Sequence, residues 1–392
     1  MTAGHSAAGS AVGYWYQTAW ALLELLRRGP DMPDARITLE LHDDVAWDAE
    51  GTPTERLQLK HHLNRAASIG DKAVDLWRTI GVWLDEASPA DPDGAVLVLV
   101  TTALAPDGSG VSLLRPGSRQ PAEALRLIEL AAAESTSQES EANRARFLAM
   151  TDIDRHSMIS RMYLVDGAPQ AIDLDSAVRK QLTWVMPRGR EDLFMQMLWG
   201  WWNHEALSLL MGHRGSIGVG EVQERVTDIR DQFAADRLPT LLHLADIDRD
   251  EVIQLVGDRT FVAQLRLIDW PEQNLQRALI DYYRAFVHTT RWVDDDLIGL
   301  PELVNFGLEL IEEWKSEFEF MKIGLAADAS EAELKAAGVA LLRKLLASTS
   351  VRVRPRYDDA FFARGKRHEL ADQMQIGWHP DYERALGIEV SS

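Results

Sequence analysis

The 392-residue sequence contains no cysteine, so disulfide bonds and thiolate zinc sites are excluded. Basic residues are scarce: 41 lysines and arginines stand against 61 aspartates and glutamates, which gives a formal net charge of −20. No apolar run approaches the roughly 20 residues that a membrane-spanning helix requires. The N-terminal segment also lacks the basic region of a secretory signal. These absences predict a cytoplasmic protein that contacts no membrane.

The acidic balance argues against general nucleic-acid binding, which usually leaves a basic footprint on a protein. It remains compatible with a nuclease whose DNA path is locally basic, or with one that binds DNA only as part of an assembly. The chain is too long for one compact core, so two or three domains are expected. Its 13 tryptophans should be mostly buried or lie at interfaces, because each indole ring has a large apolar area to cover.

The N-terminal half predicts five elements from its hydrophobic patterns. In chain order they are a helix, two strands, a helix and a strand, over residues 14–28, 36–44, 55–61, 71–87 and 95–102. Asp71 is a candidate cap for the second helix. The last segment is a continuous apolar run, which suits a central strand covered on both faces.

The remainder of the chain predicts a change of fold class. A loop-like region precedes two helices, which are separated by a polar loop over 134–143, and residues 160–165 return as a strand. From about residue 189 the patterns are helical. We therefore expect an α/β domain over 1–188, with a mixed sheet flanked by helices, and an all-α domain over 189–392 that serves for interactions.

Polar side chains gather on the first two predicted strands. Because residues two apart share a face of a strand, Glu40, His42 and Asp44 should lie on one side of the first strand, and Gln58 and Lys60 on one side of the second. Paired as a hairpin, the strands would join two carboxylates, a carboxamide and an ammonium. Carboxylates hold Mg²⁺ or Mn²⁺, the cation acidifies water, and lysine stabilises an oxyanion. The alternative is a solvated face with ordinary charges, since this spacing is common by chance.

Five short motifs resemble one nuclease family. They are GYWYQ at 13–17, LELHDDV at 39–45, LQLKHH at 57–62, DLWRTIGVW at 75–83 and VLVTTA at 98–103. Together they look like the N-terminal PD-(D/E)xK nuclease domain of CBASS-type antiphage effectors, which also occurs in the effector of Lamassu, or ABC-three-component, defence systems. The resemblance implies a restriction-endonuclease-like domain that cleaves double-stranded DNA with Mg²⁺ or Mn²⁺.

The same resemblance implies which residues form the site. Asp44 and Glu40 would hold the metal, Lys60 would act on the attacking water, and Gln17 and Gln58 would position ligands. Gln58 stands where the family pattern usually has an acidic residue, and as a metal ligand it contributes no charge. Glu40 or a water must then complete the metal shell.

The C-terminal half carries a second resemblance. YYRAFVHTTRW at 282–292, LIEEWKSEF at 310–318 and the closing GKRHELAD…GWHPDY at 365–382 resemble the C-terminal domain of ABC-three-component effectors. This implies an SMC-like ATPase that senses DNA and a small accessory subunit as partners. It also implies that the nuclease is restrained in the complex and becomes active as a homo-oligomer.

Two other function classes remain open. In the first, the N-terminal fold is a catalytically inactive scaffold, although a decayed site should have lost Asp44, Gln58 and Lys60. In the second, the nuclease acts on RNA, although no feature of the sequence reads a 2′-hydroxyl.

Two histidine clusters allow two interpretations each. His61 and His62 are adjacent at a strand end and cannot both face one ion without distortion, so His61 is expected to brace the site or contact phosphate. His368, Asp372 and His379 have the composition of a zinc site, but a hydrogen-bonded cluster that pins the C-terminal tail is the preferred interpretation.

Two further clusters are similarly ambiguous. Trp199, Trp201 and Trp202 suit base stacking, but at helical spacing they more often belong to a core or a subunit interface. The basic residues between 352 and 367 suit contact with DNA or an acidic partner. They equally suit neutralisation of acidic helices such as 309–320.

Overall fold

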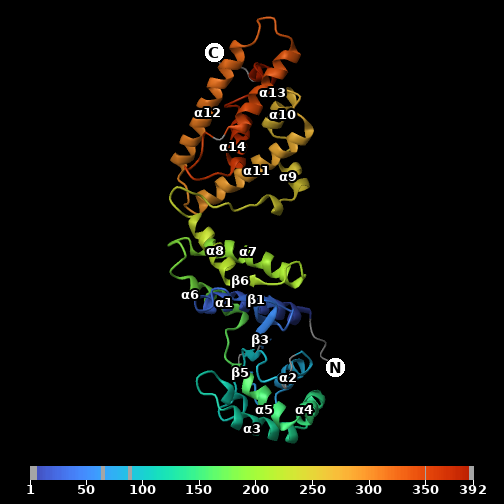
Figure 1. Ribbon diagram of the computed structural model, residues 1–392. Coiled ribbons are helices and arrows are strands. Elements are labelled where there is room, and N and C mark those ends of the chain that lie inside the picture. Colours follow the sequence, from blue (N-terminus) through green and yellow to red (C-terminus); the bar gives the residue numbers. More distant parts are fainter. Residues whose placement is uncertain (1–6, 63–66, 87–90, 349, 388–392) are drawn as a thin grey trace. The chain divides into compact units, whose positions relative to one another are not determined.

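The computed structural model describes residues 7–62, 67–86, 91–348 and 350–387. Residues 1–6, at the start of the first predicted domain, and residues 388–392, at the end of the second, lie outside the described residues. The same holds for Ala87, the last residue of the second predicted helix. The chain forms two compact units, Met1–Asp228 and Ile229–Ser392 (Figure 1). No described helix is both long and apolar enough to span a membrane.

The first unit is built on a six-stranded sheet with the order β5-β4-β3-β2-β1-β6. The strands are β1 (Arg36–Leu39), β2 (Val45–Ala49), β3 (Thr52–Lys60), β4 (Val96–Thr101), β5 (Met162–Val165) and β6 (Ile217–Gly218). β4 runs parallel to both β3 and β5, whereas the pairs β1–β2, β2–β3 and β1–β6 are antiparallel. The predicted mixed sheet is therefore confirmed.

Helices flank this sheet (Figure 1). They are α1 (Ala7–Arg28), α2 (Val74–Glu86), α3 (Pro121–Glu134), α4 (Gln138–Ala149), α5 (Asp152–Arg161), α6 (Leu174–Leu182), α7 (Glu191–Leu210) and α8 (Val219–Asp231), with short 3-10 turns at Gly29–Asp31, Val111–Leu114 and Ala171–Asp173. The apolar face of α2 is fully buried in one core with residues of β4, which includes Trp77, Trp83, Leu97 and Leu99. Burial of each such side chain contributes on the order of 1.5–3 kcal/mol.

The first predicted strand is wrong in its second half. β1 ends at Leu39, and Glu40 takes a φ of 52° in a turn closed by the hydrogen bond from the Glu40 N–H to the Asp44 carbonyl oxygen at 3.3 Å. A separate strand, β2, begins at Val45 and lies between β1 and β3. The predicted hairpin between residues 36–44 and 55–61 is therefore replaced by three antiparallel strands.

Three other local predictions change. Asp71 does not cap α2, because its carboxylate accepts the N–H groups of Gly110 and Val111 at 2.8 and 2.9 Å. The polar stretch 134–143 is not a loop throughout, since α4 begins at Gln138. Arg144 of α4 is buried and donates to the Ala132 carbonyl oxygen at 2.7 Å. The buried guanidinium thus provides a hydrogen-bond partner for a backbone carbonyl group inside the fold.

The predicted domain boundary after residue 188 differs from the observed division into units. β6 pairs with β1 through Ile217 and Ile37, and the Trp202 indole of α7 donates to the Thr18 carbonyl oxygen of α1 at 2.8 Å. Residues 189–228 consequently complete the first unit, and α7 is part of its fold.

The second unit is helical in its described residues. Its helices are α9 (Arg249–Val256), α10 (Thr260–Leu267), α11 (Glu272–Asp294), α12 (Leu300–Ile323), α13 (Glu331–Ala347), α14 (Ala360–Asp372) and α15 (Tyr382–Ala385), with a 3-10 turn at Leu244–Asp246. α11 and α14 lie side by side at its centre (Figure 1). A Cβ atom at Gly365 of α14 would meet the Asp281 carbonyl oxygen of α11 at 2.1 Å, so this approach requires glycine.

His288 of α11 makes the second unit sensitive to acid. Its Nε2 accepts the Leu241 N–H at 3.0 Å, its Nδ1 lies 2.6 Å from the Arg284 carbonyl oxygen, and burial lowers its pKa to about 4. A folded pKa below the unfolded value stabilises the fold above about pH 6.5, and this stabilisation is lost as the pH falls toward 4. By pH 5 the loss from His288 is about 2 kcal/mol.

We therefore expect His288→Gln to weaken the pH dependence of stability. The difference in the free energy of unfolding between pH 7.5 and 5.0, measured by chemical denaturation, should be about 2 kcal/mol smaller than in the wild type. The same substitution at exposed His213 serves as the control and should leave that difference unchanged. Equal pH dependence in wild type and His288→Gln would contradict the assignment.

Candidate functional site

Asp44 is the last residue of the turn between β1 and β2, and its carboxylate lies against β3. Oδ2 accepts the backbone N–H of Leu59 at 2.7 Å, and the strand register pairs Val45 with Leu57. Leu59 stands between Gln58 and Lys60 in the chain. One hydrogen bond thus holds the carboxylate at the segment that carries the other two predicted site residues.

Gln58 and Lys60 point to the same face of β3, as predicted, beside Leu99 and Thr101 of β4. Gln58 is only 4% exposed, and its Oε1 atom has no hydrogen-bond partner among the described residues. A buried carbonyl oxygen in this state costs roughly 1–3 kcal/mol, which a ligand to that oxygen would offset.

The Lys60 ammonium is half-buried and forms no ion pair within the described part of the chain. Most other partly buried cations of the first unit are neutralised: Arg28 binds Glu55, for example, at 2.6 Å. Lys60 therefore places a positive charge near Gln58 and the Asp44 carboxylate. No ion pair with a described residue neutralises this charge.

Asp43, the neighbour of Asp44, has a supporting role that the sequence did not reveal. It is 7% exposed, and its Oδ2 accepts the Trp83 indole N–H of α2 at 2.8 Å. Its Oδ1 accepts the N–H of Asp44 at 2.9 Å. Asp43 thereby ties the turn to α2 and orients Asp44. The only sequence signal was the pair of adjacent aspartates, which does not show which of the two faces the site.

Glu40 and His42 do not share a strand face with Asp44, and that prediction is wrong because all three lie in the turn after β1. Glu40 is exposed, and the His42 Nε2 lies 3.8 Å from Oδ2 of Asp48. Among the described residues, no three or more histidine, aspartate or glutamate side chains gather as a metal-binding group. The role of Glu40 as a metal ligand stays a prediction.

Gln17 lies on α1, and its buried Oε1 also has no hydrogen-bond partner within the described segments. The ring of the preceding residue, Tyr16, lies 4.8 Å from the His61 ring, which places this turn of α1 beside the end of β3. Gln17 and Gln58 are thus two carboxamides whose buried oxygens have no hydrogen-bond partner among the described residues, both in elements that meet near the end of β3.

His61 and His62 contact different partners. The His61 Nε2 accepts the Ala171 N–H at 3.3 Å, whereas the His62 Nε2 lies 3.4 Å from Oδ2 of Asp75. Burial and the neighbouring His62 lower the pKa of His61, which favours its neutral form. This arrangement favours the interpretation that His61 braces the end of β3 over the interpretation that the pair binds one ion.

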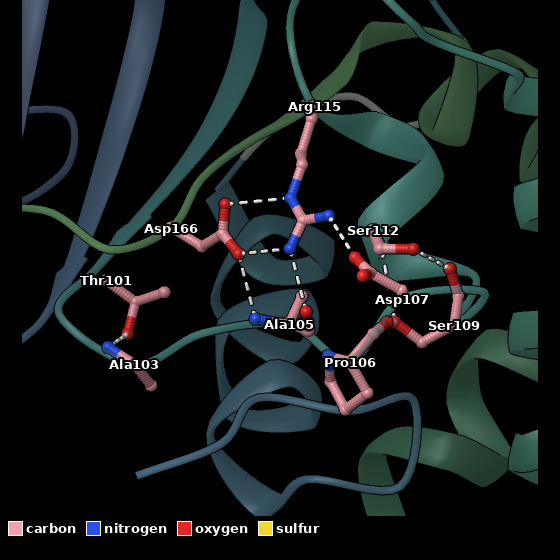
Figure 2. A network of polar contacts seen from close by, with 9 residues as sticks. All are labelled: Thr101, Ala103, Ala105, Pro106, Asp107, Ser109, Ser112, Arg115 and Asp166. Carbon is pink, nitrogen blue, oxygen red and sulfur yellow. Dashed lines mark hydrogen bonds and ion pairs between the residues drawn. The ribbon is translucent and has the colours of Figure 1, made fainter. Parts of the chain in front are cut away.

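A polar network fixes the chain where β4 and β5 end (Figure 2). The Arg115 guanidinium donates to both carboxylate oxygens of Asp166 at 3.0 and 2.7 Å, to Asp107 at 3.1 Å and to the Ala105 carbonyl oxygen at 2.7 Å. Burial raises the pKa of Asp166, but hydrogen bonds from Arg115 and the Ala105 N–H outweigh it and lower that pKa. The network buttresses β4, whose Thr101 lies beside Lys60.

The basic residues between 352 and 367 are all neutralised within the second unit. The pairs are Arg352–Asp358, Arg354–Glu302, Arg356–Asp236, Arg364–Asp281, Lys366–Glu369 and Arg367–Glu313. Glu313 belongs to the acidic segment 309–320. The structure thus supports the interpretation that this cluster balances acidic helices.

The His368, Asp372 and His379 cluster has structural partners. Asp372 accepts the Phe261 N–H at 3.4 Å and the Tyr282 hydroxyl at 3.3 Å, and the His379 Nδ1 accepts the Asp381 N–H at 3.1 Å. The Asp372 bonds hold the end of α14 against α10 and α11, and the His379 bond lies within the tail itself. His368 has ring contacts with Phe261 and Trp378, which favours the structural interpretation of this cluster.

The tryptophan cluster of α7 is divided between core and surface. Trp202 is fully buried, whereas Trp199 is half-buried and its indole N–H donates to Asp175 at 2.7 Å. The interpretation of Trp202 as core is therefore confirmed.

Comparison with known families concerns the second unit. Residues 261–386 match the family model described as C-terminal domain 7 of the ABC-three component (ABC-3C) systems. No curated protein matches the chain. The matched residues cover α10 except its first residue and all of α11 to α15, and they contain the C-terminal motifs singled out in the sequence. The match supports an ABC-three-component system member, a subunit of a multi-component complex, which is consistent with antiphage defence.

Proposed function

We propose that this chain is the nuclease subunit of an ABC-three-component antiphage system of the Lamassu type, and that it cleaves double-stranded DNA with a divalent metal. The observation that carries the proposal is the hydrogen bond from Leu59 that fixes the Asp44 carboxylate beside Gln58 and Lys60. The order of α1, three antiparallel strands, α2 and β4 supplies the frame that the restriction-endonuclease-like resemblance implies.

The donor set fits a hard cation of the Mg²⁺ or Mn²⁺ type. Asp44 offers a carboxylate already fixed by backbone, and the buried Oε1 of Gln58 lacks any other partner among the described residues. Mg²⁺ commonly takes one or two carboxylates and completes its shell with water and substrate phosphate. Because only one anionic ligand is fixed here, we expect weak metal affinity in the absence of DNA, with Glu40 or water as a further ligand.

The residues of the chain would then divide the work. The cation, when bound, supplies a Lewis acid that acidifies water and neutralises charge on the phosphate. Lys60 would donate to the phosphate oxygen or hold the attacking water, and its unused charge makes it suitable for both. Gln17 would position a ligand from α1. Asp43 would keep Asp44 in place through its bonds to the Asp44 N–H and Trp83.

Restoring the acidic residue of the family pattern tests the metal site without an activity assay. In Gln58→Glu, we expect a lower melting temperature without metal, because a buried carboxylate would lack a partner. Mg²⁺ should bind at least about tenfold more tightly than in the wild type, since a second charge enters its shell. Calorimetric titration with Mg²⁺ measures this change. Gln120→Glu, at an exposed position, is the control; equal Mg²⁺ affinity in Gln58→Glu and the wild type would argue against the site.

Substrate class separates the three functions that the sequence left open. The full chain is incubated with supercoiled plasmid and with structured RNA, each with and without Mg²⁺. Cleavage of plasmid alone, and only with metal, supports the proposal. Cleavage of RNA alone would favour an RNA nuclease, and no cleavage of either by the chain, alone or with its partners, would favour an inactive scaffold.

The partners remain part of the proposal: an SMC-like ATPase, a small accessory subunit and further copies of this chain. A net charge of −20 gives a single chain poor affinity for DNA, so self-association should raise activity by combining local basic surfaces. Light scattering and cleavage rates over a range of protein concentrations measure this together. A strictly monomeric chain whose rate is linear in concentration and unaffected by partners would exclude it.

A further inference from the structure

Two adjoining recesses of the second unit have walls rich in arginine. The first, about 280 Å³, lies among α11, α13 and α14, which Figure 1 shows next to one another. Its polar lining includes Trp270, Arg277, Asp281, Arg343, Arg364 and His368. The second, also about 280 Å³, adds Arg249 and Arg284 and shares Arg277, Asp281 and Arg364 with the first. We call the pair the arginine recesses.

The charge of the arginine recesses is not balanced locally. Asp281 is the one carboxylate on their described walls, and Arg364 occupies both of its oxygens at 2.6 and 3.2 Å. Arg249, Arg277 and Arg343 form no ion pair with any described residue. Arg284 of the second recess also lacks a carboxylate partner among the described residues, because its guanidinium donates to the Leu242 carbonyl oxygen at 3.2 and 3.1 Å. Several arginines therefore meet at these recesses around one carboxylate that is already occupied.

Two buried nitrogen atoms of residues that line the first recess also lack partners among the described residues. The Trp270 Nε1 and the His368 Nδ1 are buried without a hydrogen bond in the described part of the chain, and His368 is 1% exposed. Buried polar atoms in native proteins usually have a partner, so an orphaned one calls for a ligand or water. The recess therefore combines unpaired positive charge with unsatisfied nitrogen atoms.

We propose that the arginine recesses bind a phosphate-bearing ligand, either a free nucleotide or successive phosphates of a nucleic-acid backbone. Guanidinium groups match phosphate oxygens in bidentate geometry. Arg364 already neutralises Asp281, so the positive charge of the three unpaired arginines remains available in the two recesses. Their distribution over two adjoining recesses suits a ligand with several phosphate groups. Trp270, which is partly exposed, offers an aromatic surface on which a base stacks. This inference rests on the second unit alone and does not depend on nuclease activity.

Charge reversal at two independent positions tests the proposal in the full chain. Arg277 and Arg343 are exposed and unpaired among the described residues, so Arg277→Glu and Arg343→Glu disturb no described ion pair. Arg291→Glu is the matched control, because Arg291 is an exposed arginine in the last turn of the same helix as Arg277 and outside both recesses. Circular dichroism and melting temperature establish that each variant is folded.

Binding is measured in EDTA with four ligands: inorganic pyrophosphate, ATP, a short fluorescent single-stranded DNA and hexaglutamate. We expect Arg277→Glu and Arg343→Glu each to weaken binding of the preferred phosphate ligand at least tenfold, with Arg291→Glu unchanged. ATP and the DNA distinguish a free nucleotide from a backbone, and each loss of a phosphate contact should reduce the salt dependence of DNA binding. Absence of binding by all phosphate ligands, equal affinity in the three variants, or tighter binding of hexaglutamate would overturn the proposal.

Discussion

Replacing Lys60 with alanine is expected to lower the rate of plasmid cleavage about 10³-fold, because the phosphate then loses the cation that stabilises its developing charge. Lys60 is half-buried and lacks an ion-pair partner among the described residues, so the substitution removes little packing and strands no carboxylate. The melting temperature should therefore stay close to that of the wild type. Gel analysis of supercoiled, nicked and linear plasmid over time gives the rate.

Lys180→Ala is the matched control for this experiment. Lys180 is an exposed lysine of α6 without an ion-pair partner in the described residues, and its loss changes the net charge by the same amount. We expect the control to cleave at the wild-type rate. If Lys60→Ala and Lys180→Ala cleaved equally, Lys60 would have no catalytic role, and the activity would belong to another site or to a contaminant.

Removal of divalent metal is the second change with a large expected effect. EDTA should stop cleavage, and excess Mg²⁺ or Mn²⁺ should restore it, because one fixed carboxylate and one carboxamide cannot by themselves generate hydroxide. Ca²⁺ should bind but support little cleavage, since it is larger and prefers more oxygen ligands than Mg²⁺. The measurement is the initial rate of plasmid cleavage across a titration of each metal.

Full cleavage in EDTA would refute the role given to Asp44. The distinction between metal loss and unfolding is made by the melting temperature, which we expect to change little on adding EDTA, because the Leu59 and Asp43 contacts hold the turn without a cation. A large fall in melting temperature would instead indicate that a metal supports the fold.

The sequence predicted the shared face of Gln58 and Lys60, but it did not predict the turn that carries Asp44. Alternation along β3 placed Gln58 and Lys60 on one face, and the register with Leu99 and Thr101 confirms it. Apolar and polar residues also alternate over residues 36–44, so the sequence predicted one strand there and missed the turn after Leu39. Glu40 adopts a positive φ there, and glutamate carries no local signal for that conformation.

Nonlocal contacts account for the other differences. β6 has only two residues, and its partner β1 lies far from it in the sequence. No local sequence pattern therefore predicted β6 or the position of the unit boundary. Likewise, the carboxylate of Asp44 is placed by a bond to Leu59, and that of Asp43 by a bond to Trp83 of α2. Two adjacent aspartates acquire different roles only once β2, β3 and α2 have assembled.

The location of Mn²⁺ in crystals of the full chain, found from its anomalous scattering, tests the central claim most directly. We expect a peak that contacts both the Asp44 carboxylate and the Gln58 Oε1 atom at about 2.1 Å, the length typical of Mg²⁺–oxygen bonds. The peak should vanish in Asp44→Ala crystals grown under the same conditions. A Mn²⁺ ion bound elsewhere in a chain that cleaves DNA, with Asp44 and Gln58 free of metal, would contradict the account.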